Sequence, residues 1–207
     1  MSNFVDLSYQ ILDNMPVYPN DVKARLYQDK FLERDKYNNH TLEIGMHTGT
    51  HIDSPMHLTD SKIYIAEIPL DSFTGSGSLL DVRGEKLIGY KEKYEDEVGE
   101  GDIVFLFTSH SEKYGSEEYF TEQPVLGEDL VEFLIKKKIK MIGMDLPSPD
   151  EFPFSIHKRF FQNGILIIEN LRNLSELLYV KEFEVMAFPL KIKADSSICR
   201  VVARILD

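Results

Sequence analysis

The sequence lacks most of the features of secreted and membrane-spanning proteins. It has 207 residues, no tryptophan and one cysteine, Cys199. A lone thiol cannot form an internal disulfide, and this cysteine usage fits the reducing cytosol. No apolar stretch approaches the roughly 18 residues that suggest a membrane-spanning helix, and the amino-terminal residues do not resemble a signal peptide. We therefore expect residues 1–207 to form one cytoplasmic domain, large enough to bury a core without disulfides.

Positive charge is also scarce. The chain has 23 lysines and arginines against 35 aspartates and glutamates, a formal net charge of −12. An acidic protein repels phosphate backbones and anionic lipids, so we expect no nucleic acid or membrane partner. The basic run Lys136–Lys138 lies at the end of a predicted helix, where cations complement the helix dipole. A small molecule therefore remains as the expected partner.

Histidines are few but concentrated, since three of the six lie within residues 47–57. The glycine, the proline and the β-branched threonines of this stretch disfavour a helix. If the chain is extended there, one face carries His47, Gly49, His51, Asp53 and His57. Imidazole and carboxylate groups are ligands for zinc, manganese or iron. A polar surface loop is the alternative, but four potential ligands around a glycine favour a metal site.

The same stretch resembles the signature of the metal-dependent cyclase family, which includes bacterial kynurenine formamidase (arylformamidase) and isatin hydrolase. The signature reads His-x-Gly-Thr-His-x-Asp-x-Pro-x-His, and residues 47–57 fill every fixed position. Further blocks of the family follow in its order: Asp6-Leu7-Ser8, Pro16-Val17-Tyr18-Pro19, residues 143–148, His157, Glu169-Asn170-Leu171 and Pro189-Leu190-Lys191. The resemblance implies an α/β fold, a β-rich single domain of the swivelling β/β/α (cyclase-like) type.

The resemblance also implies a site with two divalent ions per subunit, zinc or manganese, and a homodimer. The implied metal ligands are His47, His51, Asp53, His157 and Glu169. The implied acid/base is His57, for which a further metal-ligand role is the alternative. Tyr18 corresponds to an aromatic residue that borders the substrate in the formamidase, where it is tryptophan.

Near the carboxyl end the chain departs from the family pattern Gly-x-Asp-Gly-Ser-Pro-x-Arg. It reads Ala194-Asp195-Ser196-Ser197-Ile198-Cys199-Arg200, which retains the aspartate, the serine (Ser197) and the arginine but not the glycine and the proline. The pattern leaves the roles of Asp195 and Arg200 open. Cys199 precedes an apolar run, which favours a place in the core over a role as nucleophile or metal ligand.

Hydrophobic patterns predict strands with few helices. The apolar run Ile103–Phe107 predicts a strand buried on both faces, Gly127–Lys138 a helix and Lys140–Met144 a second strand. Strand, helix and strand in this order indicate a βαβ unit with parallel strands. Asp145 follows the second strand, where it either supports the metal ligands or caps a turn.

Two shorter patterns add expectations about the approach to the site. Thr41–Met46 alternates, which predicts a strand that packs its apolar side on the core and runs directly into the histidines. Gly75–Gly77 suggests a tight turn or hinge before a strand at Ser78–Val82.

Glu169 ends the apolar run Ile165–Ile168 and is the clearest polar anomaly in the sequence. A carboxylate there is costly if it is buried without a partner. The strand could instead end at the surface, but a metal ion offsets the cost equally well, and the match with His157 favours the metal.

We therefore expect a metal-dependent hydrolase that cleaves an amide or formamide C–N bond through metal-activated water, with His57 as general acid/base. The leading substrate is an aryl formamide such as N-formylkynurenine, an intermediate of tryptophan catabolism. The alternatives are hydrolysis of a cyclic amide or lactone, as in isatin hydrolase, and a metal-binding protein without turnover.

Overall fold

Strands outnumber helices in the computed structural model, which describes residues 3–206. The strands are β1 (Phe4–Asp6), β2 (Arg25–Lys30), β3 (Asn39–Glu43), β4 (His51–Asp53), β5 (Thr74–Asp81), β6 (Leu87–Ile88), β7 (Ile103–Phe107), β8 (Val125–Leu126), β9 (Met141–Met144), β10 (Leu166–Glu169), β11 (Phe183–Met186), β12 (Ser196–Ile198) and β13 (Val202–Ile205). The α-helices are α1 (Leu32–Asp35), α2 (Tyr94–Glu97), α3 (Glu118–Thr121), α4 (Glu128–Lys136) and α5 (Ser155–Gln162). Short 3₁₀ turns are η1 (Pro55–His57), η2 (Ile65–Glu67), η3 (Leu70–Phe73), η4 (His110–Lys113) and η5 (Leu174–Leu177). Within the described range, no helix is both long and apolar enough to cross a membrane.

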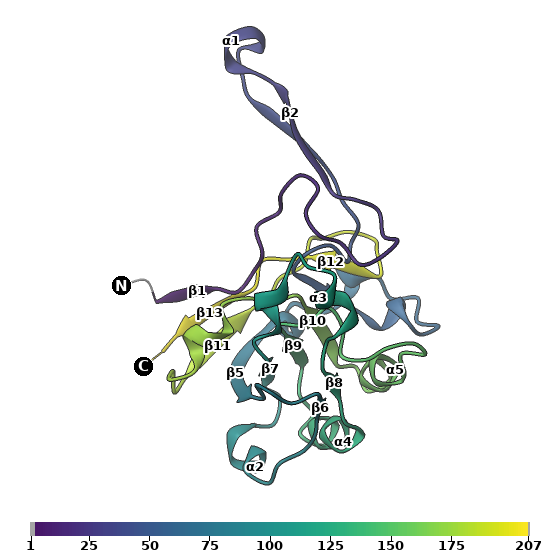
Figure 1. Ribbon diagram of the computed structural model, residues 1–207, viewed down its shortest axis with the longest axis vertical. Helices are drawn as coiled ribbons and strands as arrows, with labels where there is room; N and C mark the ends of the chain where they lie inside the picture. The colour runs from purple at the N-terminus through teal and green to yellow at the C-terminus, as the bar shows by residue number, and fades with distance from the viewer. Residues whose placement is uncertain (1–2, 207) are drawn as a thin grey trace.

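A mixed sheet forms the body of the molecule (Figure 1). Within residues 3–206 it has nine strands in the order β1-β13-β11-β5-β7-β9-β10-β4-β12. The central strands β5, β7, β9 and β10 are parallel, whereas β11, β13 and β1 on one side and β4 and β12 on the other add antiparallel. The predicted βαβ unit is present as β7, α4 and β9. The β-rich single-domain α/β fold is therefore confirmed.

Apolar side chains cover both faces of the sheet. On one face, Leu106 and Ile142 pack with residues of α4 and α5, including Leu130 and Phe160. The opposite face buries a second cluster that includes Phe105. β7 is buried along its whole length, as its continuous apolar sequence predicts. With a core on each face, the central strands make a rigid support for the residues at their ends.

The glycines of residues 75–77 lie inside β5, so the predicted turn is wrong. A side chain at Gly77 would collide with the aromatic ring of Phe183 on the neighbouring β11. A glycine within a strand allows such a close approach. This run therefore makes room for a ring and does not bend the chain.

The predicted strand Thr41–Met46 is also placed differently. β3 ends at Glu43, and among residues 3–206 it pairs only with β2. Together the two strands form an arm, residues 25–43, that extends away from the sheet (Figure 1). Leu42 remains 41% exposed, so its side of the strand does not pack on the core. The strand does not run directly into the histidine segment, because turns separate them.

Candidate metal centre

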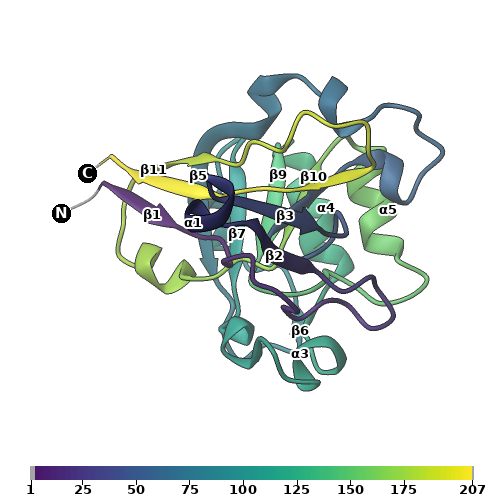
Figure 2. The same ribbon diagram turned by 90° about the horizontal axis from the view of Figure 1, so that it is seen from above.

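The centre is built where β4 lies between β10 and β12 in the sheet, and helix α5 lies beside β10, as the view from above in Figure 2 shows. His51 pairs directly with Glu169 across the antiparallel β4–β10 ladder, and Asp53 lies two residues further along β4. Paired residues and residues two apart on a strand point to the same face of a sheet. The three side chains His51, Asp53 and Glu169 are therefore brought together, and all three are buried.

The burial of Glu169 excludes the interpretation that its strand ends at the surface. The residue ends β10, but its exposed fraction is 6%, so the strand does not end at the surface. Its carboxylate oxygens lie 3.3 Å from His51 Nε2 and 3.2 Å from His157 Nε2. His157 comes from the first turns of α5 and is also buried.

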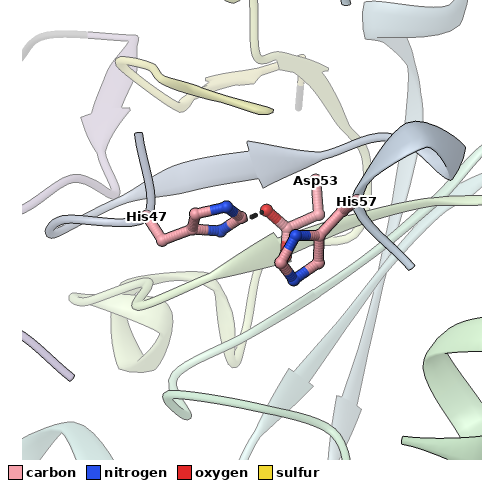
Figure 3. A group of neighbouring side chains, drawn as sticks. All are labelled: His47, Asp53 and His57. Atoms are coloured by element: carbon pink, nitrogen blue, oxygen red, sulfur yellow. Dashed lines mark ion pairs between the residues drawn. The ribbon is translucent and has the colours of Figure 1, made fainter. Parts of the chain in front are cut away.

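Turns, not one extended segment, bring His47 and His57 to the same place. Gly49 has a φ of +63°, which breaks the extended chain before β4. His57 ends the 3₁₀ turn η1. His47, Asp53 and His57 nevertheless converge (Figure 3), and an ion pair joins His47 Nδ1 to Asp53 Oδ1 at 3.0 Å. The predicted single face is therefore wrong in its geometry, although its residues do gather.

Asp53 and Glu169, both buried, each stand between two imidazoles. Asp53 Oδ1 lies 3.0 Å from His47 Nδ1 and 3.5 Å from His51 Nε2. Glu169 is placed in the same way between His51 and His157. Two sets of ligand atoms are close enough to share an ion: His47, Asp53 and His57, and His51, Asp53 and Glu169. Such a chain of alternating imidazole and carboxylate groups can bridge neighbouring cations.

The second ring nitrogen of each predicted histidine ligand meets an acceptor. His51 Nδ1 lies 2.8 Å from the Gly49 carbonyl oxygen. His157 Nδ1 lies 2.5 Å from Asp150 Oδ1, and His47 Nε2 lies 3.0 Å from Asp195 Oδ2. Metal-binding histidines are held in this way, because the acceptor fixes the tautomer and leaves the other nitrogen for the ion.

Two buried atoms test whether the residues fit a cation. His51 Nε2 and Asp53 Oδ1 lie close to charged neighbours, but none of these contacts has hydrogen-bond geometry, so neither atom has a hydrogen-bond partner among the described residues. A buried polar atom without a partner costs about 1–3 kcal/mol, and more when it is charged. A divalent ion would satisfy both atoms, and the mixture of nitrogen and oxygen donors is one that zinc and manganese accept. The donor set therefore fits a metal ion.

In the metal-free cluster, protonated histidines stabilise the buried carboxylates. Burial lowers the pKa of His157, but hydrogen bonds to Asp150 and Glu169 outweigh it and raise the pKa to about 10. Burial likewise lowers the pKa of His47, whereas Asp53 and Asp195 raise it to about 9. Burial raises the pKa of Asp53, but the neighbouring histidines bring it below its usual value. Protons and metal ions therefore compete for the same nitrogens.

His57 differs electrostatically from the other histidines of the cluster. Burial lowers its pKa, and the attraction of Asp53 does not reverse the shift. Its Nδ1 lies 3.1 Å from Asp195 Oδ2. A neutral imidazole beside a metal site can accept a proton from water. The same ring also lies near enough to His47 and Asp53 to join them as a ligand, so both predicted roles remain consistent with its position.

A cavity of about 230 Å³ opens beside the cluster. The predicted site residues on its wall are Tyr18, His47, Asp53, His57, His157 and Glu169. The remainder includes the aromatic residues Tyr114, Phe120 and Phe154 beside aliphatic and polar ones, and the Tyr18 and Phe120 rings meet edge to face at 5.8 Å. Among the described residues that line the cavity there is no lysine or arginine. It is a small apolar chamber with ionisable groups on one wall.

Asp150 is a site residue that no sequence pattern indicates, and Asp195 is one whose role the sequence leaves open. Each contacts a histidine from a loop, and a lone aspartate in a loop has no spacing that distinguishes it from a turn residue. The surviving aspartate of the family pattern was the available signal for Asp195. Asn170 also escaped notice: its side chain donates to the Gly49 carbonyl and so supports the turn before β4.

Three other candidates lie away from the cluster. Asp145 accepts hydrogen bonds from the Thr108 amide and hydroxyl, so it joins the ends of β9 and β7 as a turn anchor. Arg200 forms an ion pair with Asp6. Cys199 is partly buried, and burial raises the pKa of its thiol far above its ordinary value, which disfavours the reactive thiolate.

Comparisons with known proteins agree with this architecture. Residues 5–151 match a family model named Cyclase and described as "Putative cyclase". The kynurenine formamidase of Bacillus cereus is 30% identical over 210 residues, covering 98% of each chain. A solved structure described as a potential metal-dependent hydrolase with cyclase activity is 27% identical with a TM-score of 0.80, covering 99% of this chain and 98% of that one. Isatin hydrolase A from Labrenzia aggregata has a TM-score of 0.86 at 21% identity, over 99% and 94% of the two chains, and supports the fold.

Proposed function

Because the chain belongs to the cyclase family, we propose that it is a metal-dependent hydrolase of C–N bonds, with aryl formamides, led by N-formylkynurenine, as its substrates. One observation carries the proposal: two buried carboxylates, each between two imidazoles, lie on the wall of a cavity that is also lined by four aromatic side chains, Tyr18, Tyr114, Phe120 and Phe154. A purely structural site needs neither the cavity nor the additional histidine, His57.

The proposed ligands are His47, His51, Asp53, His157 and Glu169, holding two ions of zinc or manganese. When bound, such ions lower the pKa of water toward about 7 and polarise a carbonyl oxygen. The acceptors behind the three histidines, the Gly49 carbonyl, Asp150 and Asp195, keep the ligand nitrogens aimed at the ions.

His57 is proposed to move the protons of the reaction. Its lowered pKa keeps it neutral near pH 7, so it can accept a proton as water attacks the formyl carbon. It then donates that proton to the amide nitrogen as the C–N bond breaks. The products are formate and an aryl amine, so one histidine serves as base and then as acid.

The cavity supports an aromatic substrate of modest size. Its volume of about 230 Å³ lies below the roughly 300–1,000 Å³ of drug-sized ligand sites. Tyr18 is proposed to face the aryl ring of the substrate beside Phe120. The flat rings of the wall favour a planar aryl group, with the scissile amide toward the histidines.

Metal analysis and a substrate screen test the proposal together. Protein purified without added metal is analysed for zinc, manganese and iron, then assayed with N-formylkynurenine, formanilide and isatin. We expect bound metal and fastest turnover of the formamides. Fastest turnover of isatin would favour the cyclic-amide alternative, and a chelator that unfolds the protein without any turnover having been found would favour a structural metal.

We also propose that the single domain works as a cytoplasmic homodimer held by the arm. The arm exposes apolar side chains, namely Tyr27, Phe31, Leu32, Tyr37 and Leu42. An isolated two-stranded hairpin is marginally stable in water, so packing against a second copy would stabilise it. Sedimentation velocity of the wild type tests this: a dimer is expected, and a monomer at micromolar concentration would contradict it.

A further inference from the structure

Asp195 lies at the edge of the metal centre, and its backbone is fixed there. Its carbonyl oxygen accepts hydrogen bonds from the Ser54 amide at 3.2 Å and the Ser54 hydroxyl at 2.6 Å. The next residue, Ser196, pairs with Asp53 in the β12–β4 ladder. The carboxylate of Asp195 is therefore held at a set distance from the metal ligand Asp53 and from the turn that carries His57.

One oxygen of this carboxylate serves two imidazoles. Asp195 Oδ2 lies 3.1 Å from His57 Nδ1 and 3.0 Å from His47 Nε2. The His47 and His57 rings are themselves neighbours, with centroids 4.2 Å apart. Asp195 thus links the wall of metal ligands to the histidine that moves protons.

We propose that Asp195 is the positioning residue for His57, an inference that rests on the proposed amide hydrolysis. Its carboxylate accepts a hydrogen bond from His57 Nδ1–H, which keeps the proton of the neutral ring on Nδ1. The unprotonated Nε2 is then left for the cavity that His57 lines. Both the orientation of the ring and its tautomer decide whether a histidine can accept a proton from water.

The same contact acts during the proton transfers. Nε2 takes a proton while the water oxygen bonds to the formyl carbon, and returns it to the amide nitrogen when the C–N bond breaks. Between these events both ring nitrogens carry protons and the ring is a cation. The carboxylate of Asp195 favours that cation, whereas a neutral amide in its place does not.

Because Asp195 also contacts His47, its removal has a second effect, the loosening of a metal ligand. Ser196 separates the two effects. Its hydroxyl lies 2.9 Å from His47 Nε2, and within residues 3–206 no hydrogen bond joins it to His57. Ser196→Ala therefore weakens the support of His47 alone and is the matched control for Asp195→Asn.

The first test measures the tautomer of His57. Long-range ¹H–¹⁵N spectra of zinc-loaded protein, with the His57 signals assigned through His57→Gln, report which nitrogen is protonated. We expect Nδ1–H in the wild type and in Ser196→Ala, and a shift toward Nε2–H in Asp195→Asn. An Nε2–H ring in the wild type, or a tautomer that Asp195→Asn leaves unchanged, overturns the proposal. This readout needs no turnover, so it decides the matter even if the protein hydrolyses no formamide.

The second test uses formanilides whose anilines differ in basicity. After added zinc has restored wild-type metal content, Asp195→Asn should still show a kcat about 100-fold below that of the wild type at an unchanged KM, with a smaller loss for nitroanilides, which need less acid assistance. In the double variant, Asp195→Asn should lower kcat no further than His57→Ala alone does. Ser196→Ala should instead lose metal and recover with added zinc. The proposal is overturned if added zinc restores the kcat of Asp195→Asn to the wild-type value. It is also overturned if the losses of kcat caused by Asp195→Asn and His57→Ala are additive in the double variant.

A conservative variant covers the case in which Asp195→Asn is misfolded. Asp195→Glu retains a carboxylate in a partly exposed position, where a longer side chain has room. We expect it to keep His57 in the Nδ1–H form and to exceed Asp195→Asn or Asp195→Ala in kcat. Equal losses in all folded variants at full metal content would show that the carboxylate does not act on His57.

Discussion

Two antiparallel strand pairs in this protein use their side chains in opposite ways. β4 and β10 lie inside the sheet and bury ionisable groups, with His51 only 1% exposed. β2 and β3 project from the body and expose aromatic and aliphatic groups, with Tyr27 41% exposed. Both departures from the usual rule of apolar inside and polar outside underlie the proposals made above, a cation for the first pair and a second copy of the chain for the second. The predictions below test each proposed partner separately.

The largest effect is expected from Glu169→Gln, which removes a charged ligand while preserving its shape. We expect metal content to fall well below stoichiometric and turnover to drop by a factor on the order of 10³ or more, because the chemistry depends on the metal. Metal analysis and formanilide assays measure both. Glu184→Gln, which replaces a strand glutamate paired with Arg204, is the control and should match the wild type. Normal turnover in Glu169→Gln would show that the buried pair of His51 and Glu169 takes no part in the reaction.

His57→Ala should separate proton transfer from metal binding. We expect kcat to fall about 10²–10⁴-fold, the usual contribution of a general acid/base, at unchanged metal content. His40→Ala, at an exposed histidine of β3, should leave kcat unaltered. Loss of metal from His57→Ala, and not from the His40 variant, would identify His57 as a ligand.

The pH dependence of stability should distinguish metal-free from metal-loaded protein. In the metal-free fold the pKa of His157 is raised from 6.5 to about 10, and that of His47 from 6.5 to about 9. A raised pKa stabilises the fold fully below pH 6.5, and this stabilisation is lost as the pH rises toward 10. We therefore expect the metal-free protein to lose on the order of a few kcal/mol of unfolding free energy over this range.

Urea unfolding at pH 6, 8 and 10, with chelator or with zinc, measures this difference. The metal-loaded protein should lose less stability, because the cation replaces the protons and binds better as the histidines lose them. His157→Gln should reduce the decline in the metal-free protein. A metal-free protein that gains stability between pH 6 and 10 would contradict the raised pKa values of His47 and His157.

The smallest effect on the unfolding free energy is expected from substitutions at the tip of the arm. Phe31→Ser combined with Leu32→Ser should convert a dimer to a monomer, since both side chains are exposed in the single chain. The unfolding free energy of the monomer should change by about 0.5 kcal/mol or less, as for other surface substitutions. Sedimentation velocity measures the first result and urea unfolding the second. Glu33→Gln at the same tip is the control, and a double variant that remains dimeric would exclude the arm from the interface.

The sequence identifies the site residues better than it identifies their arrangement. The histidine signature and the anomalous Glu169 indicate the chemistry because each carries residue types that apolar packing does not explain. The βαβ unit is predictable because a continuous apolar run and an amphipathic helix each have a distinct period. The pairing of β4 with β10 is not, because it joins segments far apart in the chain through backbone hydrogen bonds that any residues can make.

The errors have a common physical origin. The alternating pattern of Thr41–Met46 is correct for a strand near its start, but alternation does not say what covers the apolar side. Gly75–Gly77 resembles a turn because the ring of Phe183, which requires the glycine, is contributed by another strand. Asp150 is recognisable only from the histidine beside it, and the role of Asp195 only from His47 and His57. Each of these features is decided by a tertiary neighbour.

The place of β4 within the sheet also determines when the cage for the ions can assemble. Both of its ladder partners, β10 and β12, are translated long after it, so a nascent chain emerges from the ribosome with His47, His51 and Asp53 but without Glu169 opposite them. The proposed ligand set is therefore complete only after those later strands have been made. With these ligands, metal loading would follow chain completion.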